Sequence, residues 1–259
     1  MTDQKHKKIY FVSDSHFGVP NRELSRIRED LFIRWLDMIK PEAEALYIMG
    51  DLFEFWFEYK TVVQKGYVRL LGKLAEITDS GIPVTFFRGN HDVWAFDYLA
   101  EELGIKIYPD TLTTMLKGHK FFLGHGDGLG EGDNGYKFLK KVFRNKVNQF
   151  LFRWLHPDIG TGMGLYWSNQ SRVANENSGL EAVNQAGIDR ISGFCKAELE
   201  KDPDIEYFIF GHVHKPEVVD LNGKAKYFSI GDWINYYSYL VFDGETLEHH
   251  YFKNEISGS

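Results

Sequence analysis

Acidic, amide and imidazole side chains follow short apolar runs at five places along this chain of 259 residues. Side chains of these types bind divalent cations, and in four of the five places a glycine directly precedes the first of them, which permits a tight turn. The candidate metal ligands are Asp14, His16, Asp51, Asn90, His125, His212 and His214. Because a short His-x-His pair occurs often by chance and a single buried His or Asp is usually structural, the prediction depends on all five groups together.

This set of ligands favours a centre that hydrolyses phosphate esters or anhydrides. Oxygen and nitrogen donors suit Mn²⁺, Fe²⁺ or Zn²⁺, whereas a structural zinc site is usually rich in thiolates. Two cations about 3.5 to 4 Å apart need a bridging carboxylate, and together they can hold phosphoryl oxygens and activate a water molecule. We expect Asp51 to be the bridge.

Predicted strands place these groups at one edge of a sheet. Apolar runs predict strands over residues 9–12, 45–49, 84–87, 120–123, 207–210 and 226–230. Helical spacing predicts helices over residues 24–39, 61–78, 136–155 and 180–200. The first half alternates strands and helices, and in open α/β sheets of this kind ligands bind beyond the carboxyl ends of the strands. The candidate ligands stand at those ends.

Composition indicates a folded soluble protein, and the length is enough for one α/β domain. Hydrophobic residues make up 43% of the chain and aromatic residues 16%, which excludes a disordered protein. The formal net charge of -7 argues against nucleic acid as a partner, since nucleic-acid-binding proteins gain affinity from basic surface. We expect a single domain over residues 1–259 with a helical cap inserted at about 129–195, where the succession of strands pauses.

The single cysteine and the amino terminus predict a cytoplasmic location. One cysteine, Cys195, cannot form an intramolecular disulfide, which fits a reducing compartment. Residues 1–8 lack the apolar segment of a secretory signal, and the chain has no apolar run of about 18 residues that could span a bilayer.

The five groups resemble, in order and spacing, the signature blocks of the calcineurin-like metallophosphoesterases. These blocks are Asp14-x-His16, Gly50-Asp51, Gly89-Asn90-His91-Asp92, Gly124-His125 and Gly211-His212-x-His214. The resemblance implies a four-layer α/β/β/α sandwich with a dinuclear centre between two sheets. It also implies one ion on Asp14, His16 and His214, a second ion on Asn90, His125 and His212, and the bridging role for Asp51.

The same resemblance assigns a catalytic role to His91, beside that of Asp51. His91 is not a metal ligand in that family. It would donate a hydrogen bond to the scissile phosphate or protonate the leaving group.

A looser resemblance points to the UDP-2,3-diacylglucosamine hydrolases of bacterial lipid A biosynthesis. It rests on residues 50–56, 126–129, 133–136 and 230–233 together with the insertion. Such enzymes split the pyrophosphate of their lipid-linked sugar nucleotide, an anionic substrate, into UMP and 2,3-diacylglucosamine 1-phosphate with Mn²⁺ at the inner face of the membrane. They commonly have Arg after the Asn of the third block, where this chain has His91.

Residues of the blocks and of the insertion are candidates for substrate contact. The candidate substrate-binding residues are Asn90, Asp133, Ser171, Arg172 and His212. For Ser171 and Arg172, both in the insertion, the alternative is a solvent-exposed loop.

The predicted helix over residues 136–155 combines a broad apolar face with a basic remainder. A basic amphipathic helix with aromatic residues, on an acidic protein, suits an anionic lipid surface, which predicts peripheral contact with the inner membrane. The alternative is an ordinary helix packed on its own domain with a solvated charged face.

Two other functions are consistent with the sequence. The enzyme could act on another nucleotide or phosphodiester. A catalytically silent binding scaffold with the same fold would be expected to have lost ligands or His91, and this chain retains all of them.

Overall fold

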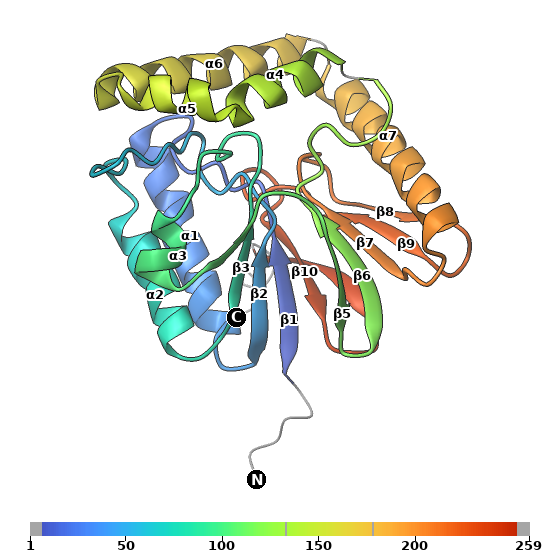
Figure 1. Cartoon of the computed structure of the whole chain (residues 1–259). Coiled ribbons are helices and arrows are strands. Elements are labelled where there is room, and N and C mark those ends of the chain that lie inside the picture. The colour runs from blue at the N-terminus through green and yellow to red at the C-terminus, as the bar shows by residue number, and fades with distance from the viewer. Residues whose placement is uncertain (1–6, 133, 178, 253–259) are drawn as a thin grey trace.

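Two β-sheets that pack face to face form the centre of the molecule (Figure 1). A computed structural model describes residues 7–132, 134–177 and 179–252. The first sheet has the order β11-β10-β1-β2-β3-β4 and the second the order β5-β6-β7-β9-β8. The strands of the first sheet are β1 (Lys8–Val12), β2 (Ala43–Ile48), β3 (Val84–Phe87), β4 (Lys106–Tyr108), β10 (Ser238–Phe242) and β11 (Leu247–Tyr251). Those of the second sheet are β5 (Leu112–Leu116), β6 (His119–Gly124), β7 (Tyr207–Phe210), β8 (Glu217–Asp220) and β9 (Lys226–Ser229).

The strands that precede the candidate ligands run parallel within each sheet. β1 pairs with β2 and β2 with β3 in parallel register, and so does β6 with β7 in the second sheet. Their carboxyl ends therefore meet at the same edge of the sandwich. Each of the five predicted groups begins within three residues of such a strand end.

Alternating side chains on the strands fill the layers on both sides of each sheet. In β1, Tyr10 and Val12 pack toward the outer helices, whereas Ile9 and Phe11 pack toward the second sheet. In the second sheet, Phe208 packs outward against the last long helix. This alternation lets each sheet contribute to two cores, because successive strand residues point to opposite faces.

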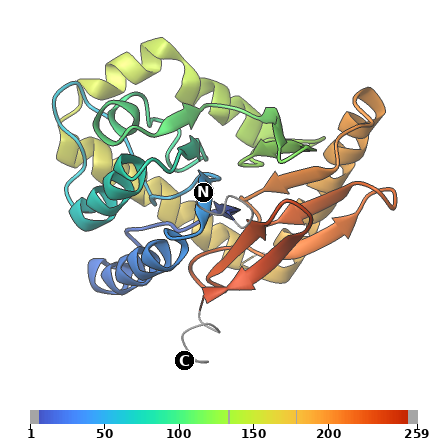
Figure 2. The same cartoon turned by 90° about the horizontal axis from the view of Figure 1, so that it is seen from below.

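Helices cover both outer faces, which confirms the predicted four-layer α/β/β/α sandwich. The helices on the first sheet are α1 (Arg22–Ile39), α2 (Val68–Asp79) and α3 (Tyr98–Leu103), and α7 (Leu180–Lys201) covers the second. Seen from below, these two groups of helices lie on opposite sides of the paired sheets (Figure 2). The predicted helix over residues 61–78 begins only at Val68, because Gly66 and Tyr67 have positive φ angles of 117° and 58° that do not fit an α-helix.

Three further helices, which we call the cap helices, cross the edge where the strands end (Figure 1). They are α4 (Asn134–Arg144), α5 (Lys146–Arg153) and α6 (Pro157–Asn177). From Ile188 onward α7 packs on the second sheet. The assignment of residues 129–195 to one cap within a single domain stays a prediction. Within the described residues, no helix combines the length and the apolar character of a bilayer span.

The prediction of one helix over residues 136–155 is wrong at Asn145. This residue has extended backbone angles (φ -68°, ψ 123°), and its side chain accepts hydrogen bonds from the N–H groups of Val147 and Asn148. Asn145 therefore ends α4 and caps the start of α5. An apolar periodicity cannot detect such a break, because it continues across it.

Two basic side chains of α4 form ion pairs with the body of the protein, while contact of this helix with a membrane stays a prediction. Lys140 forms an ion pair with Asp127 at 2.6 Å, and Arg144 forms one with Asp110 at 2.5 Å. These two charges tie the cap to the loops below it.

The helix α6 was not predicted, because its sequence contains glycines that lower helix propensity. Two of these glycines, one turn apart, permit a close approach to the body. A Cβ on Gly164 would overlap the ring of Phe55, and one on Gly160 would overlap the hydroxyl of Tyr59. Pro157 stands at the first helical position, where its missing N–H costs nothing.

Candidate metal centre

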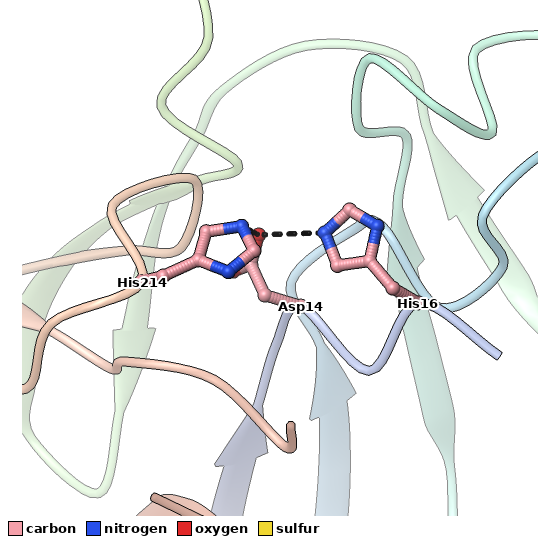
Figure 3. Close-up of side chains that lie close together, drawn as sticks. All are labelled: Asp14, His16 and His214. Carbon is pink, nitrogen blue, oxygen red and sulfur yellow. Dashed lines mark ion pairs between the residues drawn. The ribbon is translucent and has the colours of Figure 1, made fainter. Parts of the chain in front are cut away.

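The seven side chains predicted as ligands lie together at the strand ends. Ligand atoms of Asp14, His16 and His214 lie within 4.8 Å of one another. Figure 3 shows the rings of His16 and His214 beside Asp14, and their centroids are 5.0 Å apart. A second group with the same spacing consists of Asp51, His125 and His212.

Asp51 lies between these two groups. Its Oδ2 atom is 3.7 Å from Nε2 of His16 in the first group and 3.2 Å from Nε2 of His125 in the second. The same atom is 4.0 Å from Nε2 of His91, and Asp51 forms a third cluster with His16 and His91. No other carboxylate of the described residues belongs to more than one of these clusters.

Asn90 belongs to the second group by its contacts. Its Oδ1 atom is 3.3 Å from Nε2 of His125 and 3.0 Å from Nδ1 of His212. If the nearby nitrogen of each ring carries no proton, neither ring donates a hydrogen bond to the amide oxygen. The oxygen is then available as a cation ligand.

Hydrogen bonds outside the cluster decide which ring nitrogen faces inward. Nδ1 of His125 donates to the carbonyl of Met49 at 2.8 Å. Because a carbonyl can only accept, this assigns the proton to Nδ1 and leaves the lone pair on Nε2, toward Asp51. In His214, Nδ1 lies 3.3 Å from the carboxylate of Asp232, which can only accept. The proton is therefore again assigned to Nδ1, and Nε2 faces Asp14.

Backbone strain is concentrated at the centre. Asp14, His16, Asp51 and His212 all have φ angles between 43° and 65°, the left-handed region that side chains other than Gly seldom adopt. Such outliers persist only where the surroundings hold them, and they cluster at functional sites. Here they turn side chains from different strands toward a common point.

Glycine next to a ligand is required by space as well as by conformation. A Cβ on Gly89 would overlap the carboxylate and the backbone nitrogen of Asp51, and one on Gly211 would overlap the side chains of Ser13 and Asp14. The N–H of His91 donates to Oδ1 of Asp51 at 2.8 Å, and the N–H of His212 donates to Oδ2 of Asp14 at 2.9 Å. The backbone thus holds both carboxylates from close range.

The donor set fits bound cations. Among the described residues, Oδ1 of Asp14 and Nε2 of His16 are buried and have no hydrogen-bond partner, although they lie only 3.7 Å apart. Burial opposes ionisation of Asp14, but the neighbouring imidazoles of His16, His125 and His214 lower its pKa to about 2. Burial also opposes charge on His16, yet the nearby carboxylates of Asp14 and Glu54 raise its pKa to about 10. Buried carboxylates here require positive charge, which metal cations would supply.

His91 presents Nε2 to the cavity above Asp51. Its Nδ1 donates to the backbone carbonyl of Glu54 at 2.9 Å. Burial lowers the pKa of His91 below its usual value, although Asp51 acts in the opposite direction. An anionic phosphate against Nε2 would raise this pKa again, because an opposite charge favours the protonated ring.

A cavity of about 640 Å³ opens between the centre, α6 and the start of α7. The predicted substrate-binding residues Asn90, Ser171, Arg172 and His212 line it. The predicted contact Asp133 lies outside the described residues. Arg172 also reaches Glu54 of the body, with 2.7 Å between Nη2 and Oε2.

Three residues at the centre had no predicted role. Glu54 accepts hydrogen bonds from His16 and from two side chains of α6, Ser168 and Arg172. Asp232 contacts His214. Glu54 and Asp232 lie in the segments that carry the looser family resemblance, and this resemblance could have identified them as candidate site residues. Ser168 had none, because its helix was not predicted.

Comparison with known proteins agrees with this geometry. The model of a family described as calcineurin-like phosphoesterase matches residues 7–216. The UDP-2,3-diacylglucosamine hydrolase of Porphyromonas gingivalis is 37% identical over 254 residues, covering 93% of this chain and 95% of that protein. The enzymes of the same name from Vibrio atlanticus and Stenotrophomonas maltophilia are 26% and 30% identical, covering 93% and 92% of this chain and 96% of each relative. The chain therefore belongs to the calcineurin-like phosphoesterase family.

Proposed function

We propose that this protein is a metal-dependent hydrolase that splits the pyrophosphate bond of UDP-2,3-diacylglucosamine into UMP and 2,3-diacylglucosamine 1-phosphate, a step of lipid A biosynthesis. The observation that carries the proposal is the cluster of carboxylate, amide and imidazole ligands at the base of a cavity between α6 and the start of α7. Relatives that bear the name of this activity align along more than nine tenths of the chain, which supports the same substrate.

Two divalent cations are the cofactor of the proposed reaction. Asp14, His16 and His214 would hold one, Asn90, His125 and His212 the other, and Asp51 would bridge them. When bound, the cations supply charge neutralisation for the phosphoryl oxygens and activation of the attacking water. We propose Mn²⁺ as the ion, with Fe²⁺ or Zn²⁺ as alternatives, because oxygen and nitrogen donors suit all three.

The chain's own residues bind the substrate and handle the proton. His91, with its Nδ1 hydrogen held by the Glu54 carbonyl, would donate from Nε2 to the scissile phosphate or to the leaving oxygen. Asn90 and His212 would contact the phosphate, and Ser171 and Arg172 would contact it from the cap side of the cavity. The guanidinium of Arg172 is suited to this task because its planar donors match phosphate oxygens.

An exposed apolar stripe on α5 supports contact with a membrane surface. Val147, Phe150, Leu151 and Trp154 recur at helical spacing and are 58% to 77% exposed. Exposed apolar surface of this kind marks contact with lipid or protein, and basic side chains beside it favour anionic lipid. We propose that the cap, an insertion in a single domain, docks on the cytoplasmic face of the inner membrane, where a diacylated substrate resides.

The test is a direct assay of the purified protein with Mn²⁺ on UDP-2,3-diacylglucosamine in detergent micelles, with release of UMP as the readout. We expect UMP and 2,3-diacylglucosamine 1-phosphate as the products, and no release after chelation of the metal. Hydrolysis of an aryl phosphodiester without any action on the sugar nucleotide would identify a phosphodiesterase of other specificity. Absence of both bound metal and hydrolysis would identify a silent scaffold.

A further inference from the structure

Glu54 is a buried carboxylate of the body that serves two parts of the molecule at once. Oε2 accepts from Nδ1 of His16 at 2.8 Å on one side and from Nη2 of Arg172 at 2.7 Å on the other. Oε1 accepts from the hydroxyl of Ser168. His16 belongs to the strand-end centre, whereas Ser168 and Arg172 belong to α6 of the cap.

The segment that carries Glu54 is fixed to the body. Its N–H donates to the carbonyl of Phe17 at 3.0 Å, and Phe17 in turn donates to Leu52 at 2.9 Å. The side chain of Glu54 is 1% exposed. Because its backbone is hydrogen-bonded and its side chain is buried, the Glu54 carboxylate has a fixed position. It can therefore accept hydrogen bonds from Ser168 and Arg172 of α6.

The hydrogen bond to His16 decides how that ring meets the centre. Because a carboxylate only accepts, it holds the proton on Nδ1 and turns the lone pair of Nε2 toward Asp14 and Asp51. A carboxylate behind a ligand imidazole also raises the basicity of the ring and fixes its orientation, and losing such a partner costs about 10- to 100-fold in metal affinity.

We propose that Glu54 is a positioning residue that couples the position of α6 over the cavity to cation binding at the metal centre. A cation on Nε2 of His16 makes the Nδ1 hydrogen a stronger donor, which holds Glu54 in the position that accepts Ser168 and Arg172. Metal binding thereby fastens α6 over the cavity, and loosening of α6 releases one of the supports of His16. This inference rests on the proposed metal centre.

Hydrogen exchange and metal titration of the whole chain of 259 residues, without substrate, test this coupling. In the wild type, Mn²⁺ should slow amide exchange in α6. Glu54→Gln should weaken Mn²⁺ binding about 10- to 100-fold by calorimetry. The same substitution should speed exchange of α6 in the metal-free protein about tenfold, because a neutral amide oxygen accepts more weakly from His16 and Arg172 than a carboxylate does.

Arg144→Gln is the matched control. Its ion pair with Asp110 also ties the cap to the body but has no contact with Glu54. This variant should speed exchange in α4 while Mn²⁺ affinity and the slowing of α6 by Mn²⁺ stay as in the wild type. A merely structural role for Glu54 would change cap exchange in the same way as Arg144→Gln, without a change in metal affinity.

Ser168→Ala keeps the test open if Glu54→Gln does not fold. It removes one donor to Glu54 without a change in charge, so the slowing of α6 by Mn²⁺ should shrink. If the wild type binds Mn²⁺ and α6 exchange does not respond, or if Ser168→Ala leaves the response intact, the coupling is wrong while the metal centre stands. If the wild type binds no divalent metal, the proposed function fails together with the coupling.

Discussion

The core of the body buries large aromatic side chains, whereas the cap helices expose several of them. In the body, Trp35 of α1 is fully buried and contacts Phe32, Trp233 and Tyr239 at ring-centroid distances of 5.1 to 5.2 Å. In the cap, Trp154 is 77% exposed. Buried rings stabilise the layers that hold the ligands, whereas exposed rings add little stability and are available for binding.

Polar groups differ between the two regions in the same manner. In the centre, the side chains of Asp14, His16, Asp51 and His125 are buried, and several are held by backbone N–H groups or carbonyls. In the cap, charged residues are partly exposed and form ion pairs with loops of the body. The comparison indicates a centre whose polar groups are held from several sides and a cap that is joined to the body by ion pairs and by local apolar packing.

The largest expected effect is at the centre. Asp51→Ala should lower hydrolysis to background, because two cations close together would lose the one carboxylate that lies within reach of both ligand groups. Metal content of the purified variant and its rate give the measurement. Two bound ions per chain with near-normal turnover would show that the bridge has been assigned to the wrong residue.

His91→Ala should leave the metal in place and lower turnover by about 10² to 10⁴, the usual contribution of a positioned acid or base. The variant should melt like the wild type. His91 also lies within the cluster of His16 and Asp51, so loss of metal would identify it as a ligand. An unchanged rate would leave it with a structural role only.

A pair of Trp substitutions separates the two uses of aromatic residues. Trp35→Ala should cost about 3 to 5 kcal/mol of unfolding free energy, as expected for a large buried ring. Trp154→Ala should change stability by no more than about 0.5 kcal/mol, because its ring is mostly in water. Denaturant melts measure both.

The Trp154 variant also tests the membrane proposal. Trp154→Ala combined with Phe150→Ala should retain the rate on an aryl phosphodiester and lose efficiency on a diacylated sugar nucleotide in micelles or vesicles. Equal losses on both substrates would mean that this stripe serves the fold of the cap instead of lipid contact.

The smallest expected effect concerns the fit of α6 on the body. Gly162→Ala should stabilise the protein by up to about 1 kcal/mol, because a Cβ there meets nothing within 4 Å and Ala is the better helix former. Gly164→Ala, two residues on, should destabilise it, because the Cβ would overlap the ring of Phe55. Equal melting of the two variants would show that α6 does not sit as closely on the body as the structure has it.

Much of the body could be predicted from local sequence. Apolar runs located the central strands, and the polar groups after them identified the residues that gather at the sheet edge. The family resemblance predicted the four layers. The alternation of Ile9 and Phe11 with Tyr10 and Val12 shows why two layers form beside the first sheet, because successive strand residues point to opposite faces. These features depend on short stretches whose signals do not change with the rest of the fold.

The cap and the support of the centre depended on tertiary structure. Apolar spacing runs through Asn145, yet the backbone there leaves the helix. The glycines of α6 weaken a local helix, and packing against Phe55 makes them necessary. The link from His16 through Glu54 to Arg172 joins residues 38 and 118 positions apart in sequence. The sequence by itself determined which residue types meet at the strand ends. Only the tertiary structure decided which ring nitrogens face inward and which cap side chains reach the centre, because those choices depend on partners that are distant in the chain.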